Sequence, residues 1–253
     1  MEYAAMTFWL LVIVFSAVAV HRLWSGLIQP RIVNSILLPG TLVAQLGHVL
    51  GLLITGGTVN NTTLIKDDES GEPQTASNVK PRIPVVGPVI IAMLPILACI
   101  ISIYAVSQYL GQDILGRMAR ENVSRQLPTS LAAVWPLLRD SITLAERLVE
   151  ATLASRFDDW RTWVFIYLVI CLTVRMAPLP GMLRGAIGAI LVLGILTALV
   201  GLVSSTGGVS LVDSGWPLLS FSVAALLFLL LATLAVHGLV GLVKILFGQE
   251  KAG

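Results

Sequence analysis

The clearest chemical spacing in the chain lies in residues 41–55, which read Thr-Leu-Val-Ala-Gln-Leu-Gly-His-Val-Leu-Gly-Leu-Leu-Ile-Thr. In a His-Glu-x-x-His helix, two imidazoles four residues apart bind Zn²⁺ from one face, and the glutamate takes a proton from the bound water. Here Ala44 stands at the first histidine, Gln45 at the glutamate and His48 at the second histidine. One imidazole cannot replace three protein ligands, and an amide is no base near neutral pH. The segment keeps the frame of a metal helix but argues against catalysis.

A lone imidazole within an apolar helix is costly unless it finds a hydrogen bond. Gln45 precedes His48 by three residues on the same helical face and could supply that bond. We therefore expect a polar pair that joins helices, with a ligand or proton site as the alternative. Glycines at positions 40, 47 and 51 predict close packing of this helix, because small residues let backbones approach.

The helices that carry these residues are membrane-spanning. Of 253 residues, 56% are hydrophobic and 12% charged, with a mean hydropathy of +0.89, which is too apolar for a soluble globule. The formal charge of +2 excludes a nucleic-acid role driven by bulk charge. Apolar runs of about 20 residues suit the membrane core. We place the spans at Thr7–Val20, Val33–Ile54, Val85–Leu110, Trp163–Val174, Gly185–Val203 and Pro217–Phe247.

The predicted fold is an all-α polytopic bundle of about six transmembrane helices, with a short β segment and an amphipathic extramembrane helix. Residues 1–110 hold the first three spans, the vestigial metal motif and a polar loop at 56–82. Residues 111–160 form the amphipathic extramembrane segment, and residues 161–253 hold the last three spans. β-Branched residues at 58–65 predict a hairpin or an edge strand. The charge distribution leaves both membrane orientations open.

The extramembrane segment predicts a helix with an apolar stripe. Leu131, Trp135, Leu138 and Ile142 recur at helical spacing, with charged residues on the other faces. Pro136 either kinks this helix or marks its first turn. The stripe packs on the transmembrane bundle or lies in the headgroup layer, or it forms a docking face for a partner protein.

Several motifs together resemble the site-2-protease-like intramembrane zinc metalloproteases. The run from Leu38-Pro39-Gly40 to His48 is similar to the P-G-x-x-x-H-E-x-x-H helix of that family, and Leu53-Ile54-Thr55-Gly56 to the L-x-T-G that follows it. Pro84-Val85-Val86-Gly87-Pro88 through Pro95 resembles the third span of the family, which packs beside the metal helix. The segment from Met176-Ala177-Pro178 to Gly185 resembles the A-P-S-x-x-D segment, whose aspartate is the third ligand.

The resemblance implies which positions would form the site. The family cuts substrate helices with a membrane-embedded zinc and its activated water. Its ligand and base positions correspond here to Ala44, Gln45, His48 and Met182, so one of the four functional groups is retained. Removing any one of them should lower the rate by orders of magnitude.

Three functions follow as hypotheses. The first is a non-catalytic, protease-derived membrane scaffold or complex subunit, without a cofactor, that binds other membrane proteins. The second is an active peptidase that holds zinc through an unusual or mutated ligand set. The third is a small transporter-like bundle, weakened because only His48, His237 and Arg175 could be ionisable groups within spans. The expected surroundings are the lipid bilayer of a prokaryotic inner membrane and a membrane-protein partner or larger complex.

Overall fold

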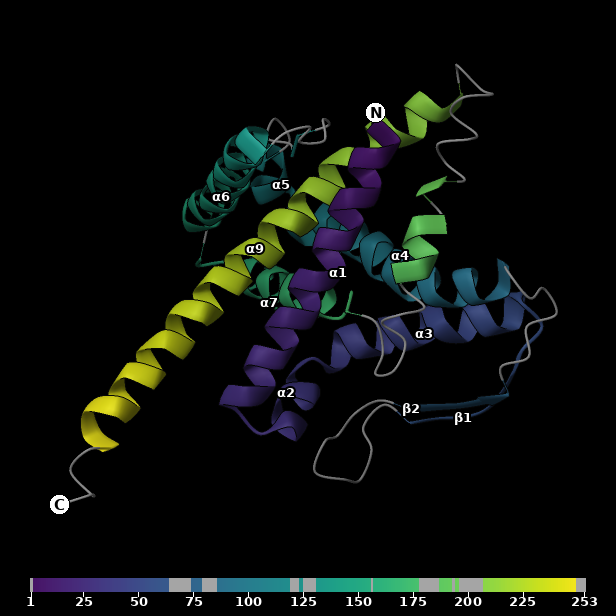
Figure 1. The fold of residues 1–253 in the computed structure, drawn as a ribbon, viewed down its shortest axis with the longest axis horizontal. Coiled ribbons are helices and arrows are strands. Elements are labelled where there is room, and N and C mark those ends of the chain that lie inside the picture. The colour runs from purple at the N-terminus through teal and green to yellow at the C-terminus, as the bar shows by residue number, and fades with distance from the viewer. Residues whose placement is uncertain are drawn as a thin grey trace.

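The computed structural model describes residues 2–63, 74–78, 86–118, 123–124, 131–155, 157–177, 187–192, 194–195 and 207–248. Most of these residues are helical, as Figure 1 shows. The helices are α1 (Glu2–Leu27), α2 (Pro30–Ile36), α3 (Leu38–Ile54), α4 (Val86–Leu110), α5 (Gln112–Met118), α6 (Leu131–Leu153), α7 (Trp160–Val174) and α9 (Gly207–Gly248). Residues 187–192 and 194–195 are also helical.

Three helices contain stretches long and apolar enough to cross a membrane: Ala4–Leu27 in α1, Gly87–Leu110 in α4 and Trp216–Val240 in α9. Their 24 or 25 residues extend about 36 Å, more than the roughly 30 Å of a bilayer core. Helix α7 has 15 residues and reaches only about 22 Å. The predicted membrane class and its helical character are confirmed. Within the described part of the chain there are three candidate spans, or four with the bent pair α2–α3.

The predicted span from Val33 to Ile54 is not one straight helix, because the chain breaks at Leu37 into α2 and α3, which meet at 78°. Pro39 explains the break. It has no backbone N–H to donate to the carbonyl of Ser35, and its ring clashes with a carbonyl in that position. In the first turn of α3 the same proline is favourable, because the first N–H groups of a helix lack helical acceptors.

Two glycines end α3. Gly56 has a φ of 79°, in the left-handed region that favours glycine. Its N–H donates to Leu53 O at 3.2 Å, and the N–H of Gly57 donates to Leu52 O at 2.8 Å. These bonds form a Schellman motif, which satisfies carbonyls at the helix end. The chain then enters an antiparallel hairpin of β1 (Thr58–Thr63) and β2 (Gln74–Asn78), which Figure 1 shows beside α3.

Helices α1 and α9 lie side by side through the centre of the bundle, and α6 packs on α9 (Figure 1). The Trp24 indole on α1 donates to Thr233 Oγ1 on α9 at 2.8 Å. Helix α6 begins at Leu131, so Pro136 lies inside it. The later part of α9 extends beyond the other helices, and residues 234–240 are exposed on every face.

Candidate functional site

Helix α3 carries Ala44, Gln45 and His48 into the contact with α4 and the core. All three side chains are buried, with His48 only 1% exposed and Gln45 2% exposed. The imidazole lies beside the backbone of Ile91 on α4 and interacts with it. Its Nδ1 atom has no hydrogen-bond partner in the described structure. The expected partner of His48 was Gln45, but the backbone that the imidazole meets belongs to the neighbouring helix.

The sequence of α4 explains why the Ile91 carbonyl is open to a donor from another helix. Pro95 lies four residues after Ile91 and has no N–H, so the carbonyl of Ile91 lacks its usual donor in the helix. An unpaired carbonyl buried between helices costs about 1–3 kcal/mol. His48 on α3 lies beside this carbonyl. The imidazole therefore sits between the two helices at the turn where Pro95 leaves α4 short of one hydrogen bond.

The glycines of α3 allow this close approach. A Cβ at Gly47 would lie 2.7 Å from the carbonyl oxygen of Leu94 and 2.8 Å from Cα of Pro95. A Cβ at Gly51 would lie 3.0 Å from Cα of Ile91. These positions confirm the close packing predicted from the glycine pattern. They also show that α4 fills the space beside the face that carries His48.

The donor set does not fit a zinc ion. Ala44 offers a methyl group and Gln45 a neutral amide, which leaves His48 as one imidazole ligand where zinc takes three or four. Met182 lies outside the described residues, so the structure does not place it relative to His48. No group of three or more His, Cys, Asp or Glu side chains in the described ranges is arranged to hold a metal. We therefore derive no metal-dependent step.

A second polar cluster, not predicted from the sequence, joins α1, α2 and the end of α7. Arg175 donates from Nη2 to Asn34 Oδ1 at 2.6 Å, and His21 Nε2 lies 3.3 Å from the same oxygen. Asn34 and Arg175 are both buried. The sequence signal was a polar Asn34 within an otherwise apolar run. Arg175, an ionisable candidate for a transport path, is here held by a neighbouring helix.

Helix α7 makes hydrogen bonds to the bend between α2 and α3. The Ile36 carbonyl, next to the break, accepts a hydrogen bond from the Tyr167 hydroxyl at 2.8 Å and a weaker one from Cys171 Sγ at 3.4 Å. Gly40 lies against the carbonyl of Cys171, where a Cβ would clash. Broken helices are tolerated in membranes when neighbouring groups satisfy the freed carbonyls. Helix α7 serves this role here.

The predicted partner-binding face lies on α6. Trp135 is 73% exposed, and Leu138 and Ile142 are about half exposed. Leu131 begins the helix, but its side chain lies outside the described residues. Another face of α6, which includes Leu144 and Leu148, belongs to the core shared with α9. The structure therefore brings part of the stripe to the surface and buries other positions of the helix.

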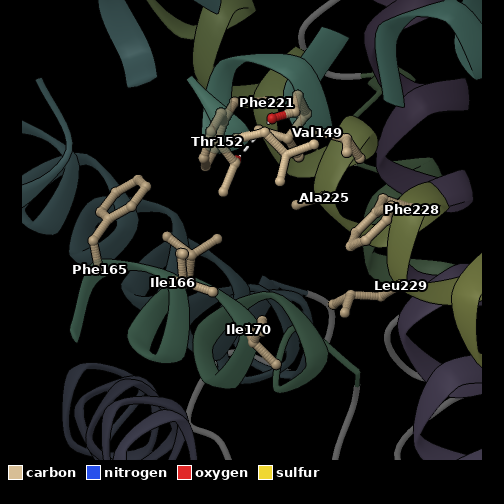
Figure 2. A pocket seen from close by; sticks show the side chains of 12 residues that line it. Val149, Thr152, Phe165, Ile166, Ile170, Phe221, Ala225, Phe228 and Leu229 are labelled. Carbon is tan, nitrogen blue, oxygen red and sulfur yellow. Dashed lines mark hydrogen bonds between the residues drawn. The ribbon is translucent and has the colours of Figure 1, made fainter. Parts of the chain in front are cut away.

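An apolar cavity of about 190 Å³ lies between α6, α7 and α9, with Phe165, Phe221 and Phe228 among its walls (Figure 2). Among its lining residues Thr152 alone has a polar side chain, and its hydroxyl donates to Leu148 O of the same helix at 2.7 Å. Ligand sites usually include a few polar groups that orient the ligand. This cavity offers apolar contact without such groups.

Comparisons with protein-family models, with curated proteins and with solved structures found no match for the chain. The likeness to site-2-protease-like proteins rests on the sequence motifs alone. The functional argument must therefore come from the residues and contacts of this chain.

Proposed function

We propose that this chain is a non-catalytic membrane protein on a protease-derived frame, which serves as a scaffold or subunit that binds other membrane proteins. The observation that carries the proposal is that Ala44, Gln45 and His48 are all buried where α3 packs on α4. A metal-binding histidine gives one ring nitrogen to the ion and hydrogen-bonds through the other, so a catalytic helix is defined by its full set of ligands and its base. Here one imidazole remains, beside the methyl group of Ala44 and the amide of Gln45.

The proposal includes a multi-pass topology. Helices α1, α4 and α9 and the bent pair α2–α3 provide spans by length and composition. We count α7, together with the residues that flank it, and the apolar run at 185–203 as two further spans, which makes about six. A multi-pass bundle without an active site still offers lipid-facing helices as contact surfaces. Van der Waals packing and interhelical hydrogen bonds drive such association in membranes.

Metal content and cleavage test the loss of catalysis. The wild-type protein and the double variant A44H/Q45E would be purified from membranes, analysed for zinc and incubated with transmembrane-helix substrates. We expect less than stoichiometric zinc and no zinc-dependent cleavage from the wild type. Stoichiometric zinc together with cleavage that a chelator abolishes would show an active peptidase and refute the proposal.

Site-directed photo-crosslinking in native membranes tests the scaffold. Leu46 and Leu50 lie four residues apart on the exposed side of α3, where a partner helix could pack. A photoreactive residue at Leu46 should yield one reproducible adduct with a membrane protein, lost when Leu50 is changed to Trp. The exposed Phe15 on α1 is the matched control position. Lipid adducts alone at Leu46 would contradict binding at this face.

A further inference from the structure

The exposed side of α6 poses an energetic problem. Cavities between α6 and α9 are lined by Phe221, Phe228 and Leu231, so α6 flanks the part of α9 that lies within the candidate span Trp216–Val240. The charged residues of α6 nevertheless point outward: Arg139, Asp140, Glu146, Arg147 and Glu150. A charged side chain facing hydrocarbon costs about 2.5–3.5 kcal/mol or more. A surface that supplies opposite charges would lower this cost.

Along the exposed stripe of α6, charged and apolar side chains follow an order that would match an identical stripe running in the opposite direction. Trp135, Arg139, Glu146, Glu150 and Leu153 are spaced by three, four or seven residues, which places them along one side of the helix. All five are exposed. A cation lies toward the beginning of the stripe, two carboxylates lie toward its end, and a large apolar side chain stands at each extremity.

We propose that this stripe binds the same stripe of a second copy of the chain, with the two α6 helices antiparallel about a twofold axis. An axis between Thr143 and Glu146 places Arg139 of each copy opposite Glu150 of the other. The same register brings Trp135 of each copy beside Leu153 of the other. A twofold interface repeats each contact, so the pairing forms two ion pairs and two apolar contacts. This inference does not depend on whether the chain binds zinc.

A hollow next to the stripe supports the register. A cavity of about 420 Å³ between α6 and α9 is lined by apolar side chains of both helices, among them Ile142, Phe228 and Leu231, and by Glu146 and Glu150. An arginine side chain fits such a hollow, because its stem is apolar and its guanidinium pairs with carboxylates. Arg139 of the second copy would reach it from its place opposite Glu150. Arg147, 3.5 Å from Glu150 in the same chain, stays at the rim.

Charge reversal in reconstituted liposomes tests this pairing. Full-length protein labelled with donor and acceptor dyes would be diluted with lipid, and the dimer fraction measured by energy transfer. Wild-type protein should dimerise, and Arg139→Glu or Glu150→Arg alone should weaken the dimer by about tenfold or more, since each places like charges together. The double variant R139E/E150R should recover to within about twofold of wild type. Arg161→Glu, an exposed charge on α7, is the matched control and should have no effect.

Cross-linking checks the register independently. Thr143→Cys, in a chain with Cys99 and Cys171 changed to Ala, should form a disulfide between copies under mild oxidation, because residue 143 lies near the proposed axis. Cysteine at Arg161 should not do so. A wild-type protein that stays monomeric at every dilution overturns the proposal, as expected for an α6 that lies in the headgroup layer. A dimer that charge reversal leaves unchanged, or that the double variant fails to restore, overturns it as well.

Discussion

The imidazole of His48 on α3 lies beside the backbone of Ile91 on α4, four residues before Pro95. The proline withholds the N–H that would normally bond to the Ile91 carbonyl, and the imidazole is placed to donate in its stead. The residue that the family resemblance assigns to metal binding thus has a structural partner. This pairing also explains why a polar side chain is kept in a contact otherwise made by glycines and apolar residues.

The dependence of His48 on Pro95 can be measured with a double-mutant cycle. His48→Leu should lower the free energy of unfolding by about 1–3 kcal/mol, because it leaves a buried carbonyl without a donor. In a Pro95→Ala background the helix supplies its own donor, so the same change should cost less than about half as much. Chemical unfolding in detergent micelles gives both values. Leu52→Ala, at a buried position of the same helix, is the control and should lower the free energy of unfolding equally in both backgrounds. If His48→Leu also costs the same in both backgrounds, His48 does not compensate for Pro95.

Gly47 is required for the contact of α3 with α4. Gly47→Ala should destabilise the protein by about 1–3 kcal/mol, because the new Cβ would lie 2.7–2.9 Å from atoms of Leu94, Pro95 and Ala98. Gly26→Ala is the control, since nothing lies within 4 Å of its added Cβ and alanine favours the helix. Thermal unfolding in micelles compares the two. If the Gly47→Ala protein is as stable as the Gly26→Ala protein, the close contact between α3 and α4 does not contribute to stability.

Tyr167 should stabilise the bend between α2 and α3. Tyr167→Phe removes the hydroxyl that donates to Ile36 O and should cost about 0.5–1.5 kcal/mol. Tyr109→Phe, at a side chain that is 81% exposed, should change stability by less than about 0.5 kcal/mol. The same unfolding assay serves for both variants. If both phenylalanine variants behave alike, the bond from Tyr167 does not contribute to stability.

Replacing Asn34 should lower the stability of the protein more than replacing the neighbouring Ser35. Asn34→Leu removes the oxygen that accepts from Arg175 at 2.6 Å and leaves that guanidinium buried with less compensation. We expect a loss of about 1.5–3 kcal/mol, the range for hydrogen bonds to charged groups. Ser35→Ala, on the neighbouring exposed position, removes only a hydroxyl bonded to Arg31 O and is the control. An Asn34→Leu protein that unfolds like this control would contradict a stabilising role for the cluster.

Much of the helical layout was predictable, because hydropathy is a local property of the chain. The apolar runs at Val85–Leu110 and Trp163–Val174 correspond closely to α4 and α7. The bend at Leu37 was missed even though Pro39 signals it, since an apolar run alone does not show where a helix turns. The partner of Asn34 could not be predicted, because Arg175 lies 141 positions away in the chain.

The sequence alone determined that the chain is a helical membrane protein, and that Ala44 and Gln45 cannot act as the ligand and base of a metal helix, because these properties belong to individual side chains. The tertiary structure alone decided that His48 meets the carbonyl left without a donor by Pro95, and that α6, with its exposed charges, packs on a helix long and apolar enough to span a membrane. Both facts depend on which helix faces which, and that is settled by packing across the whole bundle.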